Sequence, residues 1–420
     1  MKKINLSAGT FLAIISFSIA GSVIYELPYI RNVYYDKFVE AFGMTNAQVG
    51  FLMSAYAVGC LLLYIPGGIL ADKFSTKKML VLSLMGTGAL GIVMALSMNY
   101  VTALIAFFLF AVTTSFVFWA ALNKGLRIIG GKEDSGSTYG WYYALGSVIS
   151  LVCGLGFWAL YTSTENSHDA MFRTIMAMSI AVIVSGVLVQ ITFKEENTSL
   201  AQTAEEDKFR LSDVGKAIKN PYLWWASIIM FLIYTIYSNV SYFTPYLSSQ
   251  VGMDVSDSSF LGIIRGYVFY FLSPVGGYIA DKLLKSTLRL YGYGFIGLAV
   301  LFFAATRVPA GEDSVVIAIV ISLLASAFAM MLYGVMWSIL NEIDIPISYA
   351  ATAIGISSMV IYLPDLFVPA MIGSWLDNYG EEAGYFRMFI FFGICCMLAV
   401  VLSLTLAERV KMMKAAKKIK

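Results

Sequence analysis

Long apolar runs separated by short polar segments make up almost the whole chain. Twelve of them are long enough to cross a bilayer, at 8–30, 47–71, 78–97, 101–122, 139–161, 171–193, 221–246, 257–280, 288–306, 314–340, 349–375 and 385–407. A hydrocarbon core about 30 Å thick needs roughly 20 apolar residues per helical crossing, whereas transmembrane strands would alternate over about ten residues. The pattern therefore predicts an all-α polytopic membrane protein with twelve transmembrane helices.

The composition supports this class. The chain is 59% hydrophobic and 13% charged, with a mean hydropathy of +0.78, far from an ordinary soluble domain. The four cysteines lie in apolar runs and the single histidine, His168, lies in a polar loop. Neither these residues nor any G-x-x-x-x-G-K-[ST] run indicates a metal or nucleotide site. We expect no cofactor, no metal and no nucleic-acid partner.

A polar segment divides the runs into two sets of six. It predicts an N-terminal six-helix bundle at 1–194, a cytoplasmic linker at 195–220, and a C-terminal six-helix bundle with a basic tail at 221–420. Within the linker, residues 209–218 place apolar positions near one face, as in a short interfacial helix.

Internal repeats relate the two halves. The segment Pro66–Lys73 returns at Gly276–Lys282, with Asp72 and Asp281 separated by 209 positions. Three further matches have offsets of 217, 218 and 214, and they are Tyr25–Tyr29 with Tyr242–Tyr246, Trp119–Asn123 with Trp337–Asn341, and Phe172–Arg173 with Phe386–Arg387. Four matches in the same order predict an ancestral duplication of a six-helix unit.

Basic residues predict the orientation. Of the 28 lysines and arginines, 22 fall at the termini, in the central segment and in the loops on the same side. Because cytoplasmic loops carry the excess of Lys and Arg, both termini and the linker should be cytoplasmic. The basic tail at 411–420 would lie near anionic membrane lipid.

Together these features resemble the major facilitator superfamily. Its loop between helices 2 and 3 reads G-x-L-A-D-R/K-x-G-R/K-R/K, and this chain matches it at Gly68, Leu70, Ala71, Asp72, Lys73 and Lys77. Ser75 and Thr76 depart from it. The resemblance implies a secondary transporter that works by alternating access, with a substrate site between the halves and a proton or counter-substrate gradient as energy source. We expect a monomer.

The same resemblance gives the repeated loops a gating role. Asp72 and Lys73, with Asp281 and Lys282, would latch the cytoplasmic side. A carboxylate at a helix end can meet the positive N-terminus of a neighbouring helix, which is worth about 0.3–2 kcal/mol.

Two charges lie deep inside apolar runs. Arg265 is about 12 Å and Asp365 about 15 Å below the outer surface at the helical rise of 1.5 Å per residue. A charge near a helix centre costs roughly 2.5–3.5 kcal/mol, so it persists when paired or hydrated. Arg265 is predicted to bind an anionic substrate, with Asp365 as competing partner or proton carrier. The alternative is a static Arg265–Asp365 bridge that ties two helices together.

Other candidates are weaker. Glu26, predicted near the outer end of the first helix, is either a coupling carboxylate or a snorkelling partner of Arg31. Tyrosine and tryptophan side chains inside transmembrane helices usually need a hydrogen-bond partner for their O–H or N–H group, so we expect some of them to face the substrate. The substrate-binding candidates are Arg265, Tyr56, Asp365, Tyr362, Trp119, Trp337, Tyr333, Tyr237, Tyr25 and Tyr142.

The function that Arg265 favours is transport of a small organic anion, either monocarboxylate-like or zwitterionic. Monocarboxylate-type carriers of the superfamily resemble this chain in placing an arginine in helix 8. The proline-containing glycine motif of drug:proton antiporters is missing from helix 5. An exporter of amphipathic molecules is the first alternative, and a non-transporting membrane receptor or an intramembrane enzyme is the second.

Overall fold

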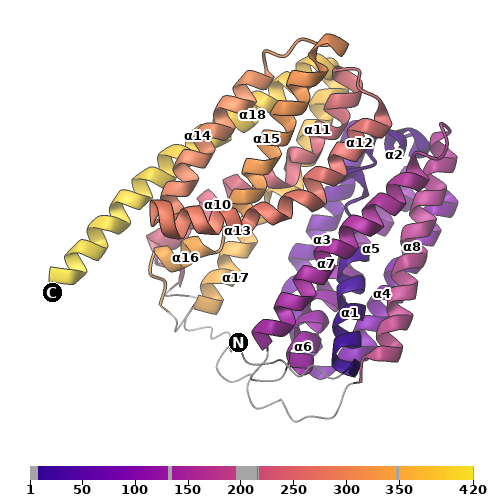
Figure 1. Ribbon diagram of the computed structural model, residues 1–420, viewed down its shortest axis with the longest axis horizontal. Coiled ribbons are helices and arrows are strands. Elements are labelled where there is room, and N and C mark those ends of the chain that lie inside the picture. The colour runs from indigo at the N-terminus through magenta and orange to yellow at the C-terminus, as the bar shows by residue number, and fades with distance from the viewer. Residues whose placement is uncertain (1–7, 131–134, 195–214, 216, 347–349, 420) are drawn as a thin grey trace. The chain divides into compact units, whose positions relative to one another are not determined.

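The computed structural model describes residues 8–130, 135–194, 215, 217–346 and 350–419, without the side chains of 8, 64–73, 135–137, 350–351 and 416–419. These residues form helices joined by short turns, and no strand occurs among them (Figure 1). The chain divides into two compact units, 1–202 and 203–420. Their boundary falls within the predicted linker, most of which lies outside the described residues together with the predicted interfacial helix at 209–218. The linker therefore stays a prediction.

The N-terminal unit is a bundle of eight α-helices among the described residues. They are α1 (Ala8–Val23), α2 (Tyr35–Phe42), α3 (Asn46–Lys73), α4 (Thr76–Ser97), α5 (Tyr100–Ala111), α6 (Trp119–Gly130), α7 (Ser135–Tyr161) and α8 (Ser167–Thr192). A π-helical segment, η2 (Val112–Phe118), joins α5 to α6 in one continuous crossing. Three helices have an N-cap residue whose side chain accepts a hydrogen bond from a backbone N–H group of the first turn. These residues are Ser75 on α4, Asn99 on α5 and Asn166 on α8.

The C-terminal unit has more broken helices. Its long straight members are α10 (Pro221–Asn239), α14 (Thr287–Ala305) and α15 (Val315–Gly334), while α16 (Ser338–Glu342) and α17 (Ala350–Ile361) are short. The crossing at 255–284 runs through α12 (Val255–Ile263), η6 (Ile264–Val268), η7 (Phe269–Leu272), α13 (Ser273–Tyr278) and η8 (Ile279–Leu284). After α10 come η4 (Val240–Tyr242), α11 (Phe243–Pro245) and η5 (Tyr246–Gln250). The last element, α18 (Pro364–Ile419), contains two crossings that meet at Gly380, where φ is 76°.

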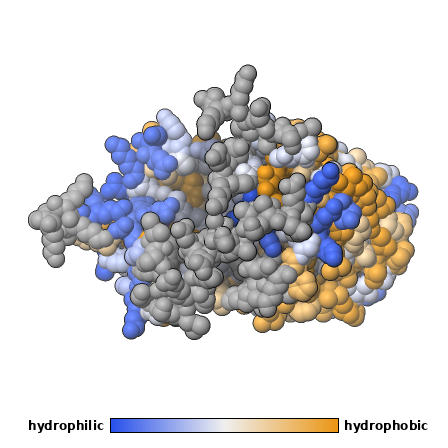
Figure 2. Space-filling model, turned by 90° about the horizontal axis from the view of Figure 1, so that it is seen from below, coloured by the Kyte–Doolittle hydropathy of each residue, from blue (hydrophilic) through white to orange (hydrophobic). Residues whose placement is uncertain are grey.

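Among the described residues, ten helices are long and apolar enough to cross a membrane. The shorter apolar helix Gly9–Val23 and the division of the last one at Gly380 account for all twelve predicted crossings. Large apolar side chains stay exposed on the bundle surfaces, for example Leu82, Leu96, Ile191 and Val316. Figure 2 shows hydrophobic residues covering one flank, on helices of the N-terminal unit. Such a surface suits lipid rather than water.

Several predicted boundaries need correction. The crossing predicted at 101–122 continues to Gly130. The first helix ends at Val23 instead of residue 30, so Glu26 lies in the turn that follows it. The predicted crossing at 314–340 breaks after Gly334 and resumes at Ser338, and the one at 349–375 breaks between Ile361 and Pro364. Proline explains the last break, because it lacks a backbone N–H and restricts the preceding residue.

Small residues let helices of each unit approach closely. A Cβ on Gly91 of α4 would lie 2.2 Å from the Ser179 hydroxyl oxygen of α8, and one on Gly88 would lie 2.5 Å from Ile183. In the other unit, a Cβ on Gly292 of α14 would lie 2.3 Å from Leu404 of α18. Close contact through small residues is the usual packing device of membrane helices, because lipid provides no hydrophobic drive for association.

Candidate functional site

The buried charges of the C-terminal unit lie on its irregular helices. Arg265 is on the π-helical η6, and Asp365 is in the first turn of α18, directly after the break that follows Ile361. Thr244 and Tyr234 come from the crossing that is interrupted after Asn239. Single π-turns and discontinuous helices frequently mark functional sites, since they expose backbone and re-aim side chains.

The Arg265 guanidinium is almost fully buried and only partly satisfied. The side chain is 5% exposed, and its Nη2 donates a hydrogen bond to the Thr244 hydroxyl. Its Nε and Nη1 have no hydrogen-bond partner within the described part of the chain. Leaving a buried donor unsatisfied costs about 1–3 kcal/mol, and more for a charged group. The arrangement leaves N–H groups of a fixed, planar cation available to an anion.

Asp365 has a different partner. It is 6% exposed, and its Oδ2 accepts a hydrogen bond of 2.6 Å from the hydroxyl of the buried Tyr234. Its place in the first turn of α18 also favours a negative charge, because backbone N–H groups give a helix N-terminus partial positive character. The observed hydrogen bonds thus tie Arg265 to Thr244 and Asp365 to Tyr234.

Tyrosines surround Asp365. The ring centroid of Tyr234 lies 4.8 Å from that of Tyr362, in an edge-on contact, and 6.2 Å from that of Tyr333. The rings of Tyr237 and Tyr333 are stacked, with 3.7 Å between their centroids. The hydroxyl oxygen of Tyr237 is 2.9 Å from that of Tyr270. Tyr362 is 37% and Tyr270 45% exposed, so the cluster is not fully buried. We call these five residues the tyrosine cluster. The structure brings together four predicted candidates here: Tyr237, Tyr333, Tyr362 and Asp365.

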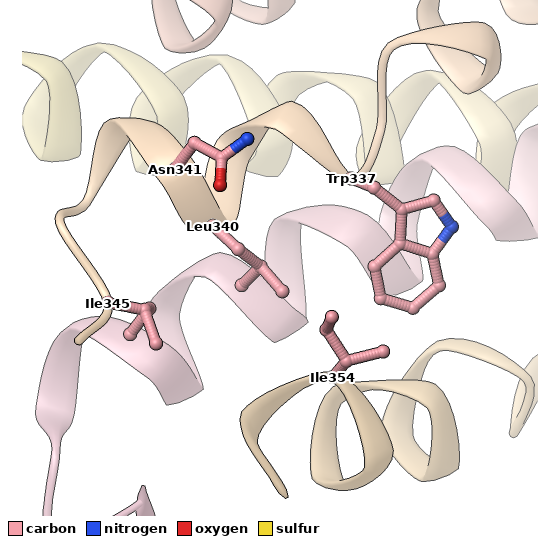
Figure 3. Close-up of a pocket in the computed structure, with 5 residues that line it drawn as sticks. All are labelled: Trp337, Leu340, Asn341, Ile345 and Ile354. Atoms are coloured by element: carbon pink, nitrogen blue, oxygen red, sulfur yellow. The ribbon is translucent and has the colours of Figure 1, made fainter. Parts of the chain in front are cut away.

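Trp337 follows Tyr333 by four positions, at the break between α15 and α16. It lines a pocket of about 200 Å³ with Leu340, Asn341, Ile345 and Ile354. In Figure 3 the side chains of Trp337, Leu340 and Ile354 point toward one another. The pocket is smaller than the ~300–1,000 Å³ of typical ligand sites and is lined mainly by apolar groups. It suits helix packing better than recognition of a charge.

In the N-terminal unit, two of the four candidates, Tyr56 and Tyr25, are connected by aromatic contacts through Tyr29. The Tyr56 hydroxyl is 2.9 Å from that of Thr114 in the π-helical η2. The ring centroid of Tyr29 lies 5.7 Å from that of Tyr56 and 6.4 Å from that of Tyr25. Trp119 is half-buried at the start of α6, and its carbonyl accepts a hydrogen bond from Asn123. The fourth candidate, Tyr142, is buried in the core of this unit, where a Cβ on Gly21 would touch its hydroxyl.

Glu26 is buried in the turn after α1, close to Tyr34. Burial raises the pKa of Tyr34 well above its usual range, and the negative charge of Glu26 raises it further. The Tyr34 hydroxyl donates to the Gly154 carbonyl at 3.3 Å. Arg31, five positions after Glu26, is also buried. Glu26 is thus held among buried groups rather than at an exposed interface.

The predicted gating residues are described only in part. The side chains of Asp72 and Lys73 lie outside the described residues, while Asp281 and Lys282 are exposed on η8. The N-terminus of α14 is instead met by Glu342 from α16. Its two carboxylate oxygens accept from the Ser286 hydroxyl at 2.5 Å and from the Leu288 backbone N–H at 2.9 Å.

Sequence reasoning did not single out Thr244, Tyr234 or Glu342 as site residues. Thr244 belongs to the Tyr-Phe-Thr-Pro-Tyr repeat, which in the sequence indicates only a duplication. Tyr234 is one intramembrane tyrosine among many, and its spacing gives no signal that it meets Asp365. Glu342 occupies the position that corresponds to Lys124 in the first half, so a reversed charge within the repeat was the available clue.

Comparison with known proteins decides the family. The family model of the Major Facilitator Superfamily matches residues 6–369. The chain belongs to this superfamily. The chain is 29% identical over 406 residues to the inner membrane protein YqcE of Escherichia coli (strain K12), a match that covers 95% of each chain. It is 21% identical over 377 residues to the hexuronate transporter of Bacillus subtilis (strain 168), a match that covers 85% of this chain and 86% of the relative.

A third relative, the probable sulfoacetate transporter SauU of Cupriavidus necator, is 22% identical over 375 residues, with 81% of each chain covered. Among solved structures, a bacterial homologue of the human lysosomal transporter Spinster superimposes with a TM-score of 0.75 at 14% identity. The match covers 96% of this chain and 98% of that one. These findings confirm the predicted fold class, a multi-pass all-α protein with two six-helix bundles, and the family implies a transporter rather than an enzyme.

Proposed function

We propose that this protein is a secondary active transporter of a small organic anion, monocarboxylate-like or zwitterionic, that works by alternating access. The observation that carries the proposal is the state of Arg265. It is 5% exposed, and two of its three guanidinium nitrogens have no hydrogen-bond partner among the described residues. A buried cation in this state gains most from an anionic ligand.

The guanidinium has the geometry for this task. Its N–H groups form a planar fork that matches a carboxylate or a related oxyanion with two parallel hydrogen bonds. Thr244 holds Nη2, so the fork has a fixed orientation before a ligand arrives. Such preorganisation improves affinity, because less conformational entropy is lost on binding.

The relatives support the substrate class. One is a transporter of hexuronate and another a probable transporter of sulfoacetate, and both compounds are small organic anions. Identities of 21% and 22% leave the individual substrate open. The names thus agree with the class that Arg265 favours.

Coupling is assigned to a carboxylate. Asp365 or Glu26 would carry a proton with the anion, or the anion would exchange for another one. Both carboxylates are buried, which is a setting where a change of protonation is coupled to nearby charge. We also propose an inner-membrane location, with both termini cytoplasmic, because 22 of 28 basic residues lie on that side.

A thermal-shift screen of the purified protein tests the proposal. The compounds are small carboxylates, sulfonates, phosphates, sugars and amino acids, applied to the native protein and to Arg265→Ala. We expect an anion to raise the unfolding temperature of the native protein and to lose this effect in the variant. Arg307→Ala, at an exposed arginine, is the matched control and should behave as native. A neutral compound that stabilises all three forms equally would contradict the proposal and support an exporter of amphipathic molecules.

A further inference from the structure

We infer that the end of the C-terminal unit where α14 begins and α18 ends binds the headgroup of an anionic phospholipid. The basic residues that would hold the headgroup are Arg289 of α14 and Arg409, Lys411 and Lys414 of α18. We call these four residues the headgroup site. The inference does not depend on Arg265, because it concerns the lipid around the protein and not the molecule that it transports.

Exposed apolar side chains form a stripe along each of these two helices. They are Tyr293, Ile296 and Val300 on α14, and Ile394, Leu398 and Val401 on α18, and each is at least 43% exposed. Arg289 lies four positions before the first stripe, and Glu408 lies seven positions after the second. Helical residues four or seven positions apart share a face, so both stripes lead to this pair of charged residues. In a membrane-spanning protein such stripes suit the acyl chains of lipid.

The two helices are in contact where the stripes end. The Arg289 Nη2 is 3.4 Å from the Glu408 Oε1, and three positions further along α14 a Cβ on Gly292 would lie 2.3 Å from Leu404. The stripes of α14 and α18 therefore meet at the pair of Arg289 and Glu408. A phospholipid with its acyl chains on the stripes would place its phosphate beside Arg289.

The headgroup site has more positive charge than the carboxylates near it can balance. Glu408 lies between Arg289 and Lys411, with its Oε2 4.0 Å from the Lys411 Nζ. These side chains are 36% to 68% exposed, and ion pairs between exposed groups are weak, so the cations remain able to bind another anion. Both carboxylate oxygens of Glu342 are already bound at the start of α14. In Figure 1 the yellow end of α18 projects beyond the other helices of its unit, which leaves its basic side chains accessible.

Aromatic residues of α10 indicate that this end lies at the level of the headgroups. The Arg409 guanidinium lies over the ring of Trp225, with its central carbon 5.2 Å from the ring centroid. The neighbouring Trp224 is 39% exposed, and its Nε1 donates to the Ile218 carbonyl. Tryptophan is enriched where a membrane meets water, and clusters of Lys and Arg beside a crossing attract anionic lipid. Arginine also binds phosphate through two parallel hydrogen bonds.

Two lipids that share their acyl chains provide the test. Native mass spectrometry of the purified full-length protein gives the affinity for dioleoylphosphatidylglycerol, which is anionic, and for dioleoylphosphatidylcholine, which has no net charge. We expect the native protein to bind the anionic lipid five-fold or more tightly. The double variant Arg289→Gln/Arg409→Gln should bind the anionic lipid at least three-fold more weakly than the native protein. Arg307→Gln, at an exposed arginine beyond the other end of α14, is the matched control and should bind it as the native protein does.

Glu408→Gln changes the charge in the opposite direction. It removes the carboxylate that competes for Arg289 and Lys411, so the anionic lipid should bind more tightly. Equal affinity of the native protein for the two lipids, or native affinity in a folded double variant, would refute the site. If the double variant does not fold, failure of Glu408→Gln to tighten binding refutes it instead. Displacement of the lipid by an equal concentration of inorganic phosphate would also refute a lipid site, in favour of a site for soluble anions. The thermal-shift screen tests Arg265 separately, so the two proposals can fail independently.

Discussion

Two buried charged side chains, each hydrogen-bonded to a hydroxyl group, mark the C-terminal unit at the scale of residues. Arg265 donates to the Thr244 hydroxyl and Asp365 accepts from the Tyr234 hydroxyl. A hydroxyl can satisfy one lone pair or one N–H group, but it cannot replace the hydration of a full charge. Each side chain is therefore held in place by a hydroxyl group. In addition, Nε and Nη1 of Arg265 have no hydrogen-bond partner within the described part of the chain, and a fixed side chain with N–H groups to spare is what a binding site needs.

Removal of the Tyr234 hydroxyl tests this reading of Asp365. A hydrogen bond to a charged group is worth about 1.5–3 kcal/mol, so Tyr234→Phe should lower transport efficiency roughly ten-fold or more in vesicles. Tyr291→Phe is the matched control, since it removes a buried hydroxyl of the same unit that donates to the Leu332 carbonyl. Equal losses of transport in the two variants would show that only stability had been measured.

At the scale of elements, the crossings follow from the sequence and their interruptions do not. The apolar pattern continues through residues 264–272 and 335–337, so it cannot report π-helical turns or breaks there. Pro364 gave a local signal, and the break before it is where Asp365 gains a helix N-terminus. The positions of Arg265 and Asp365 within the membrane were predictable, because charges in apolar runs are conspicuous. Their partners were not, because pairing depends on tertiary packing.

Close helix packing gives a prediction at this scale. Gly91→Val would force side-chain atoms against Ser179 and Leu27, because even a Cβ would lie 2.2 Å and 2.7 Å from their atoms. Overpacking typically costs about 1–3 kcal/mol, so thermal unfolding in detergent should shift to lower temperature. Gly156→Val introduces the same side chain on α7, where a Cβ has no atom within 4 Å. Comparable unfolding temperatures for the two variants would refute the close contact of α4 with α8.

At the scale of the whole molecule, duplication and hydrophobic pattern were enough to identify the fold. Both were visible because membrane crossings require long apolar runs whatever the details of packing. The repeats differ where chemistry is at stake: Arg265 falls 209 positions after Tyr56, the offset of the Asp72 and Asp281 loops. Tyr56 bonds Thr114 within its own unit. We propose on this ground that Arg265 of the C-terminal unit, and not the corresponding Tyr56, binds the anionic group of the substrate.

The central claim is that Arg265 binds the anionic group of the transported molecule. Its most direct test is uptake of a radiolabelled anion, selected by thermal shift, into proteoliposomes that contain the native protein, Arg265→Gln or the exposed-site control Arg307→Gln. We predict that Arg265→Gln abolishes saturable uptake while Arg307→Gln transports at the native rate. Native uptake by Arg265→Gln, at equal amounts of folded protein, would contradict the account.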